Sequence, residues 1–83
     1  MPLYLDRHDY VPGLTAEAIA QAHARDMEVA PKYGATYFRY WFDEATGRVF
    51  CLFEAPDAET GAAVHREAHG LEADEITRVQ EGS

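Results

Sequence analysis

Residues 35–55 read ATYFRYWFDEATGRVFCLFEA, and this stretch decides the fold. Its two halves are rich in aromatic and β-branched residues, which favour strands, and the four residues 44–47 between them are typical of a hairpin turn. The stretch therefore predicts two antiparallel strands, over residues 35–43 and 48–55.

The sequence on either side of this hairpin predicts one strand and one helix before it, and one helix and one strand after it. Thr15 and Asp57 are suitable N-cap residues, and Gly70 is a suitable stop for the second helix. The additional elements are a strand over 3–8, a helix over 15–33 that Pro31 kinks or ends, a helix over 57–69 and a strand over 74–80. This βαββαβ order predicts a single α+β domain over residues 1–83 with the ferredoxin-like fold, a four-stranded antiparallel sheet with two helices on one face.

The two hairpin strands lack the alternation of apolar and polar residues that is typical of a sheet with one solvent-exposed face. Val49–Phe53 is apolar throughout, and only Arg39 interrupts the aromatic run before it. Because two helices can cover only one face, we expect a second copy of the chain to cover the other, as packed sheets or as a dimeric α/β barrel. The alternative to this homodimer is an exposed apolar patch, which is a liability in a monomer.

Composition and charge narrow the classes of partner. The net charge of −8 argues against nucleic acid and against anionic membrane surfaces, and it favours cations. No apolar run approaches the roughly 20 residues of a membrane span, and residues 1–8 are too short and too charged for a signal sequence. The single cysteine, Cys51, fits a reducing compartment, so a cytoplasmic location is expected.

His65 and His69 carry the strongest functional signal. Their spacing places both imidazoles on one face of a helix, with Cβ atoms roughly 5–6 Å apart. Imidazole pairs suit zinc, copper, iron or nickel. On the spacing alone, two solvated or structural histidines are the simpler interpretation.

The predicted topology brings more candidate ligands to this pair. His8 lies at the end of the first strand, and the second helix ends at the same end of the molecule. Residues with carboxylate side chains follow both the strand and the helix. The candidate metal ligands are His8, His65, His69, Asp9 and Glu72. Such a mixed set favours a borderline divalent ion with open positions over a closed structural zinc site, and the metal and structural interpretations both remain open.

The remaining polar residues have simpler interpretations. His23 lies in the apolar stripe of the first helix and is interpreted as a buried, hydrogen-bonded structural residue. Cys51 is interpreted as a small inert hydrophobe. Charged residues within the apolar strands are expected to face the open side of the sheet, as interface ion pairs or as part of a small-molecule pocket. The candidate pocket residues are Tyr4, Asp6, Tyr37, Arg39, Trp41 and Glu54.

Several segments resemble the small nickel-binding, nickel-responsive ferredoxin-like proteins of bacteria, whose members mostly lack an assigned function. They are Met1–His8, Lys32–Gly34, Tyr40–Asp43, Phe50–Leu52 with Glu54–Ala58, and Val64–Gly70. The resemblance implies a homodimer that binds nickel weakly or reversibly and has no established reaction.

These observations favour a metal-binding protein, a sensor, buffer or carrier without catalysis, for nickel(II) or alternatively zinc(II). An enzyme or ligand-binding dimer that uses an aromatic and charged cavity on the open sheet face is the alternative, and an interaction module with structural histidines is a third. No nucleophile with an adjacent base and no phosphate-binding glycine loop can be read from the chain, so no catalytic residue is assigned.

Overall fold

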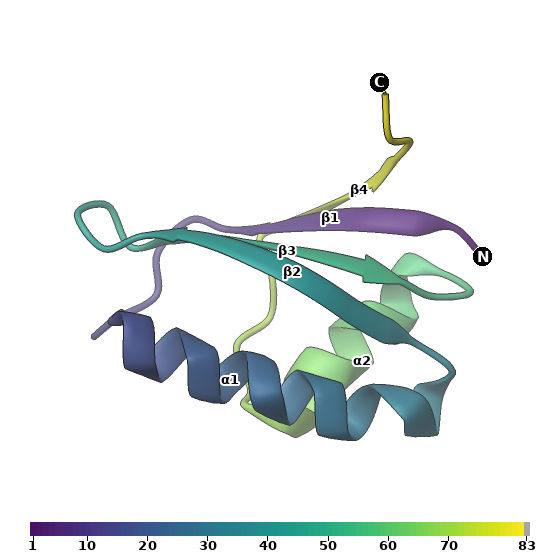
Figure 1. Ribbon diagram of the computed structural model, residues 1–83, viewed down its shortest axis with the longest axis horizontal. Helices are drawn as coiled ribbons and strands as arrows, with labels where there is room; N and C mark the ends of the chain where they lie inside the picture. Colours follow the sequence, from purple (N-terminus) through teal and green to yellow (C-terminus); the bar gives the residue numbers. More distant parts are fainter. Residues whose placement is uncertain (83) are drawn as a thin grey trace.

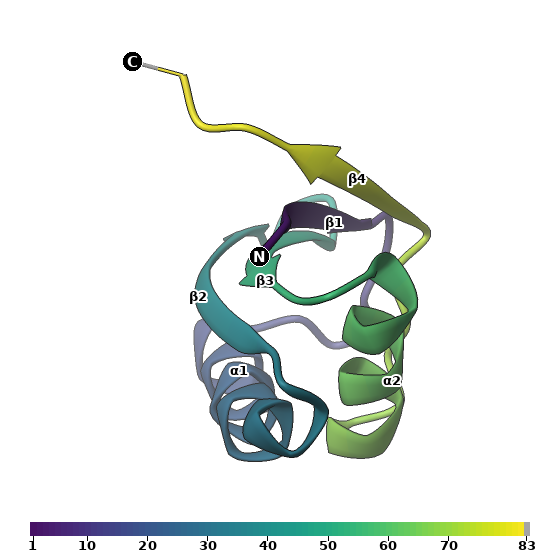
Figure 2. The ribbon, with the colours of Figure 1, turned by 90° about the vertical axis from the view of Figure 1, so that its right-hand side faces the viewer.

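The computed structural model describes residues 1–82 and has the ferredoxin-like α+β fold, which confirms the predicted class. Two helices lie side by side beneath one face of a four-stranded sheet (Figures 1 and 2). The elements in chain order are β1 (Leu3–His8), α1 (Ala16–Val29), the 3-10 helix η1 (Ala30–Tyr33), β2 (Thr36–Asp43), β3 (Arg48–Glu54), α2 (Ala58–Ala68) and β4 (Glu75–Val79).

The helix ends follow the expected capping chemistry. The Thr15 hydroxyl accepts the Ala18 N–H at 3.1 Å, and the Asp57 carboxylate accepts the Thr60 N–H at 2.8 Å. The predicted helix over 15–33 is helical to Tyr33, but α1 ends at Val29 and the last four residues form η1. Pro31 lies in η1 and has no N–H to continue the α-helical hydrogen bonds.

β3 and β1 are the two central strands of the sheet. Its strand order is β2-β3-β1-β4 and all neighbouring pairs are antiparallel, so β4 lies beside β1 as expected. In this register Asp6 stands opposite Cys51 on β3. The two side chains therefore point to the same face of the sheet.

The buried face of the sheet is the one that the helices cover. The central strands contribute alternate residues to it, Tyr4, Asp6, His8, Val49, Cys51 and Phe53. α2 packs very close to this face, since a Cβ atom at Gly61 would lie 2.2 Å from Cζ of Phe53. His65 is one turn further along α2, so the same close approach presses His65 against the sheet.

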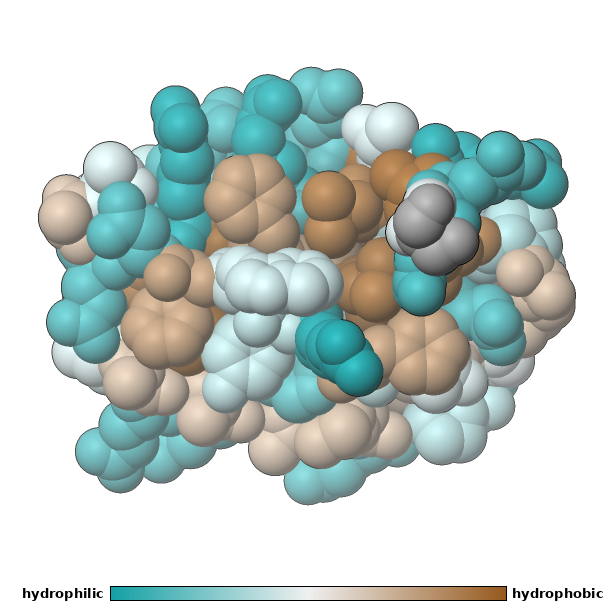
Figure 3. Space-filling view, turned by 45° about the horizontal axis from the view of Figure 1, so that its top comes forward, coloured by the Kyte–Doolittle hydropathy of each residue, from teal (hydrophilic) through white to brown (hydrophobic). Residues whose placement is uncertain are grey.

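The opposite face is open and largely apolar. Figure 3 shows apolar side chains gathered in the middle of this face with polar groups around them. Phe38 is 45% exposed and Trp41 is 49% exposed, both on β2. The prediction that the helices leave one apolar face uncovered is therefore right.

Within residues 1–82, neither helix combines the length and the apolar character that a bilayer crossing requires.

Candidate metal centre

A cluster of histidines and aspartates fills the space between the sheet and the two helices. β1 supplies two of its members, α1 and α2 one each, and the residue that caps α2 the last. They are Asp6, His8, Asp26, His65 and His69. All but His69, whose side chain is 14% exposed, are buried.

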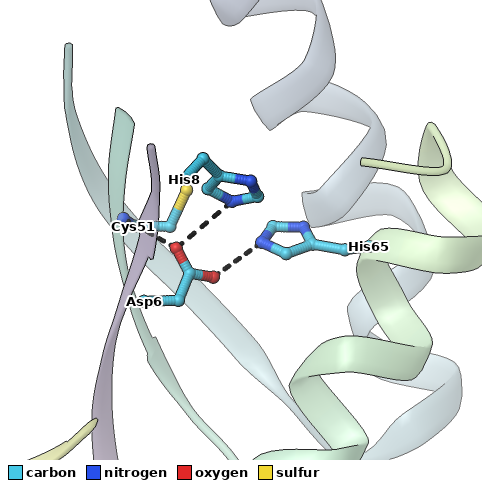
Figure 4. A group of neighbouring side chains, drawn as sticks. All are labelled: Asp6, His8, Cys51 and His65. Atoms are coloured by element: carbon cyan, nitrogen blue, oxygen red, sulfur yellow. Dashed lines mark hydrogen bonds and ion pairs between the residues drawn. The ribbon is translucent and has the colours of Figure 1, made fainter. Parts of the chain in front are cut away.

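His65 is the centre of this cluster. Its Nδ1 lies 2.9 Å from Oδ1 of Asp26, and its Nε2 lies 2.7 Å from Oδ2 of Asp6. The Asp6 contact is drawn in Figure 4. Because carboxylates only accept hydrogen bonds, both ring nitrogens must donate, which makes His65 an imidazolium. Burial alone would lower the pKa of His65, but hydrogen bonds to Asp26 and Asp6 outweigh it and raise this pKa to about 12.

The two aspartates are held as carboxylates by the same contacts. Burial opposes the charge of Asp6, but His65 and His8 outweigh it and lower the pKa of Asp6 to about 2. Burial is likewise outweighed at Asp26, whose pKa is lowered by His65 and His69. The two carboxylates carry two negative charges, and the imidazolium of His65 balances one of them. A buried, unbalanced charge is costly, so the cluster favours a further cation.

His69 and His8 lie next to the two carboxylates. Nε2 of His69 is 3.1 Å from Oδ1 of Asp26, and its Nδ1 accepts the Leu71 N–H at 3.1 Å. These contacts assign the proton of a neutral His69 to Nε2. On the other side, Nε2 of His8 is 3.4 Å from Oδ1 of Asp6, which also accepts the Cys51 N–H at 3.1 Å.

A small cavity of about 10 Å³ lies against this cluster, enough for one water-sized particle. Its wall includes all four histidines of the chain, His8, His23, His65 and His69, together with Asp26 and Cys51. The Nδ1 atom of His23 is buried and has no hydrogen-bond partner among residues 1–82. Sequence reasoning expected a hydrogen-bonded structural histidine there, and the structure instead leaves an unsatisfied polar atom beside the cavity.

The donor set fits a first-row transition metal. One group comprises Asp6, His8, Cys51 and His65, and a second comprises Asp26, His65 and His69; in each group the candidate ligand atoms lie within 4.8 Å of one another. Metal–nitrogen and metal–oxygen bonds of about 2.0–2.2 Å place two ligands at right angles about 3 Å apart. The 2.9 Å and 3.1 Å contacts of Asp26 with His65 and His69 match that spacing. Coordination would replace protons that now form hydrogen bonds.

Two of the five predicted metal ligands lie outside the cluster. The His8 and His65 rings are 5.1 Å apart and the His65 and His69 rings 4.8 Å apart, as the topology argument expects. Asp9 instead pairs with Arg7 at 2.7 Å, and Glu72 pairs with Arg66 at 3.0 Å, both at the surface. The expectation that these two carboxylates join the histidines is not met, because nearby arginines hold them at the surface.

The six candidate pocket residues do not share one face. Strand alternation turns Tyr4 and Asp6 toward the helices, and a β-bulge between Tyr37 and Arg39 buries the first and exposes the second. A single open-face pocket from this set was therefore a wrong expectation. On the open face, a hollow of about 370 Å³ is lined by Leu3, Phe38, Arg39, Leu52, Glu54 and Glu81, which leaves Trp41 outside it.

Sequence reasoning missed the role of three residues. Asp26 follows His23 by three positions on the buried face of α1, and Asp6 precedes His8 by two on one face of β1. Both spacings were signals for carboxylates beside histidines. Cys51 had no such signal, since only the sheet register brings it to Asp6. Burial raises the pKa of the Cys51 thiol to about 11, so it is protonated at neutral pH in this structure.

Fold and cluster together define a small ferredoxin-like protein with a candidate transition-metal centre. Residues 4–79 match the family described as nickel responsive protein SCO4226-like, and the chain belongs to this family. It is also similar to the protein in the crystal structure of SCO4226 from Streptomyces coelicolor A3(2), with 34% sequence identity and a TM-score of 0.90 over 98% of this chain and 99% of that one. Among curated proteins, none matches the chain.

Proposed function

We propose that this protein binds a divalent transition metal ion at the cluster around His65 and acts as a sensor, buffer or carrier without catalysis. Nickel(II) is the proposed ion, because the chain belongs to a family described as nickel responsive, and zinc(II) is the alternative. The observation that carries the proposal is the imidazole of His65 held between two buried carboxylates with two further histidines beside them.

The charge of the cluster supports a divalent ion. Asp6 and Asp26 carry two negative charges, which the proton on His65 only half balances. While the Cys51 thiol keeps its proton, a divalent ion that replaced the proton of His65 would balance both carboxylates and reduce the cost of the buried charge. The residues available to hold it form the two groups that share His65, one with Asp6, His8 and Cys51 and the other with Asp26 and His69.

The hydrogen bonds of the cluster also support reversible binding. Zinc fingers, which are structural zinc sites, are unfolded without metal. Here the His65 imidazolium already joins β1, α1 and α2 through Asp6 and Asp26. An ion must compete with this proton for the same nitrogens, which lowers its apparent affinity. Such a site suits a protein that takes up and releases metal.

Calorimetric titration with nickel(II) and zinc(II) tests the proposal. The wild type is expected to bind, and the double variant His65→Ala/His69→Ala is expected to lose binding. The double variant Asp9→Asn/Glu72→Gln is the matched control, since it removes two exposed carboxylates outside the cluster and is expected to bind like the wild type.

A second measurement needs no variant of the buried cluster. Nickel(II) is paramagnetic and is expected to broaden the imidazole NMR signals of His8, His65 and His69 in the wild type. Unchanged imidazole signals at saturating nickel, or full binding by the His65→Ala/His69→Ala variant, would show that the ion binds elsewhere or not at all.

We also propose that the protein is a homodimer that buries the open sheet face. The exposure of Phe38 and Trp41 and the apolar character of both sides of β3 support this. Light scattering is expected to give twice the chain mass, and Trp41→Glu is expected to give one chain mass. Met27→Glu is the matched control, because Met27 is also 49% exposed but lies on α1. A wild-type monomer at micromolar concentration would contradict the proposal.

A cytoplasmic location is the last part of the proposal. The chain's single cysteine, Cys51, is a free buried thiol, which suits a reducing compartment. Immunodetection in separated cell fractions checks this, and recovery in an extracytoplasmic fraction would contradict it.

A further inference from the structure

We infer that the cluster offers a metal ion two overlapping positions, which share His65 and exclude one another. This inference rests on the proposed metal binding and specifies how that site works. The inner position combines Nε2 of His65 with Asp6, His8 and Cys51. The outer position combines Nδ1 of His65 with Asp26 and His69.

The two positions lie on opposite sides of one imidazole ring. Nε2 of His65 faces Asp6 on β1 at 2.7 Å, and Nδ1 faces Asp26 on α1 at 2.9 Å. Figure 4 shows the inner group, in which dashed lines join the Asp6 carboxylate to both histidine rings and Cys51 lies beside it. Because the nitrogens of an imidazole point in different directions, an ion that binds one of them is not within bonding distance of the other.

A neutral imidazole has one lone pair for a metal, and its second nitrogen keeps a hydrogen. An ion at the inner position therefore leaves Nδ1–H of His65 donating to Asp26. An ion at the outer position leaves Nε2–H donating to Asp6. Asp6 is thus a ligand when the ion is at the inner position, and Asp26 is a ligand when it is at the outer one. In each case the other aspartate accepts a hydrogen bond from His65, and such hydrogen bonds orient metal-bound histidines in proteins. One chain then holds one ion at a time.

The two positions differ in chemistry and in access to solvent. The inner ligands are all buried and include a thiol, whereas the outer ones are nitrogen and oxygen only and include His69, whose side chain is 14% exposed. Thiolate selects softer ions such as zinc and copper(I). An ion that binds thiolate well therefore settles in the inner position, and the Cys51 thiol and Nε2–H of His65 release their protons to water.

Cobalt(II) titration tests the inference, because a cobalt–thiolate bond gives a charge-transfer band in the near ultraviolet. The wild type is expected to saturate at one ion per chain and to show this band. Cys51→Ser is expected to lose the band and still bind one ion, at the outer position. His69→Ala is expected to keep both the band and the single ion.

The double variant Cys51→Ser/His69→Ala weakens both positions and is expected to lose most binding. Asp26→Asn removes the partner that orients His65, so it is expected to keep the band while affinity falls roughly 10- to 100-fold. Circular dichroism of each metal-free variant shows whether it is folded. The charge-transfer band and the stoichiometry of the wild type test the inference without any variant.

Each contrary result has a distinct meaning. Three results would overturn the two-position inference while leaving metal binding in place. They are two ions per wild-type chain, a single ion without the thiolate band, and loss of all binding in a folded Cys51→Ser variant. A wild type that binds neither cobalt nor nickel would overturn the proposed function itself.

Discussion

Raising the pH from 7 to 9 is expected to destabilise the metal-free protein, mainly through His65. In the folded state burial lowers the pKa of His65, but hydrogen bonds to Asp26 and Asp6 outweigh this effect and raise the pKa from 6.5 to about 12. Above pH 6.5 an unfolded chain has lost this proton while the folded one retains it. The stabilisation is therefore complete below pH 6.5 and is lost as the pH rises toward the folded pKa.

The size of the effect depends only on the folded pKa lying above 9. One proton of difference between the two states changes the free energy of unfolding by about 1.4 kcal/mol per pH unit. Between pH 7 and pH 9 the loss is about 3 kcal/mol, and at roughly 4–8 °C per kcal/mol for a domain of this size the Tm falls by about 12–24 °C. Cys51 contributes little in this range, because its thiol titrates near pH 9 only in the unfolded chain.

Urea unfolding and thermal melts at pH 7, 8 and 9, with a chelator present, measure this slope. Nitrogen-15 NMR of the imidazoles is the independent readout, since His65 is expected to remain doubly protonated at pH 8. A stability that does not change between pH 7 and 9, or a neutral His65 ring at pH 8, would refute the reasoning. Asp26→Asn is the matched variant, and its slope is expected to be shallower because it removes one of the two carboxylates that stabilise the charge.

Three more outcomes are expected. Burial opposes the charge of Asp6, but the histidines lower its pKa from 3.8 to about 2. The wild type is therefore expected to lose about 2 kcal/mol of its free energy of unfolding as the pH falls through 4 toward 2. Asp6→Asn removes this carboxylate, and acid titration followed by circular dichroism is expected to show a smaller loss in the variant. Gly61→Ala places a Cβ against Phe53 and is expected to cost about 1–3 kcal/mol in urea unfolding, whereas Gly82→Ala meets nothing within 4 Å and should leave the unfolding midpoint unchanged. Nickel(II) is expected to raise the Tm more at pH 8 than at pH 6, because protons compete for the ligands; equal shifts at both pH values would contradict coordination by histidine.

Much of the fold was predictable because its signals are local. The aromatic hairpin, the caps at Thr15 and Asp57 and the stop at Gly70 each act within a few residues, and the βαββαβ order then limits the topology. The effect of Pro31 was local as well, since the α-helix ends at Val29 and the chain continues to Tyr33 as η1, which contains this proline. The same topology brought His8 to His65 and His69, because chain direction alone places the end of β1 beside the end of α2.

The ligand set was less predictable, because it depends on which way side chains turn and on how closely elements pack. Asp9 and Glu72 are near the histidines in sequence, yet arginines hold them at the surface. Asp26 is distant in sequence, yet the packing of α1 against α2 brings it to both His65 and His69.

The sequence by itself determined the order of the elements, the apolar open face and the meeting of three histidines at one end of the sheet, since periodicity, capping and chain direction are properties of short segments. Only the tertiary structure decided that Asp6 and Asp26 hold His65 between them with Cys51 alongside. The reason is physical: the strand register and the close approach of α2 at Gly61 set distances between segments that no local pattern encodes, and at these distances a buried imidazole becomes a cation.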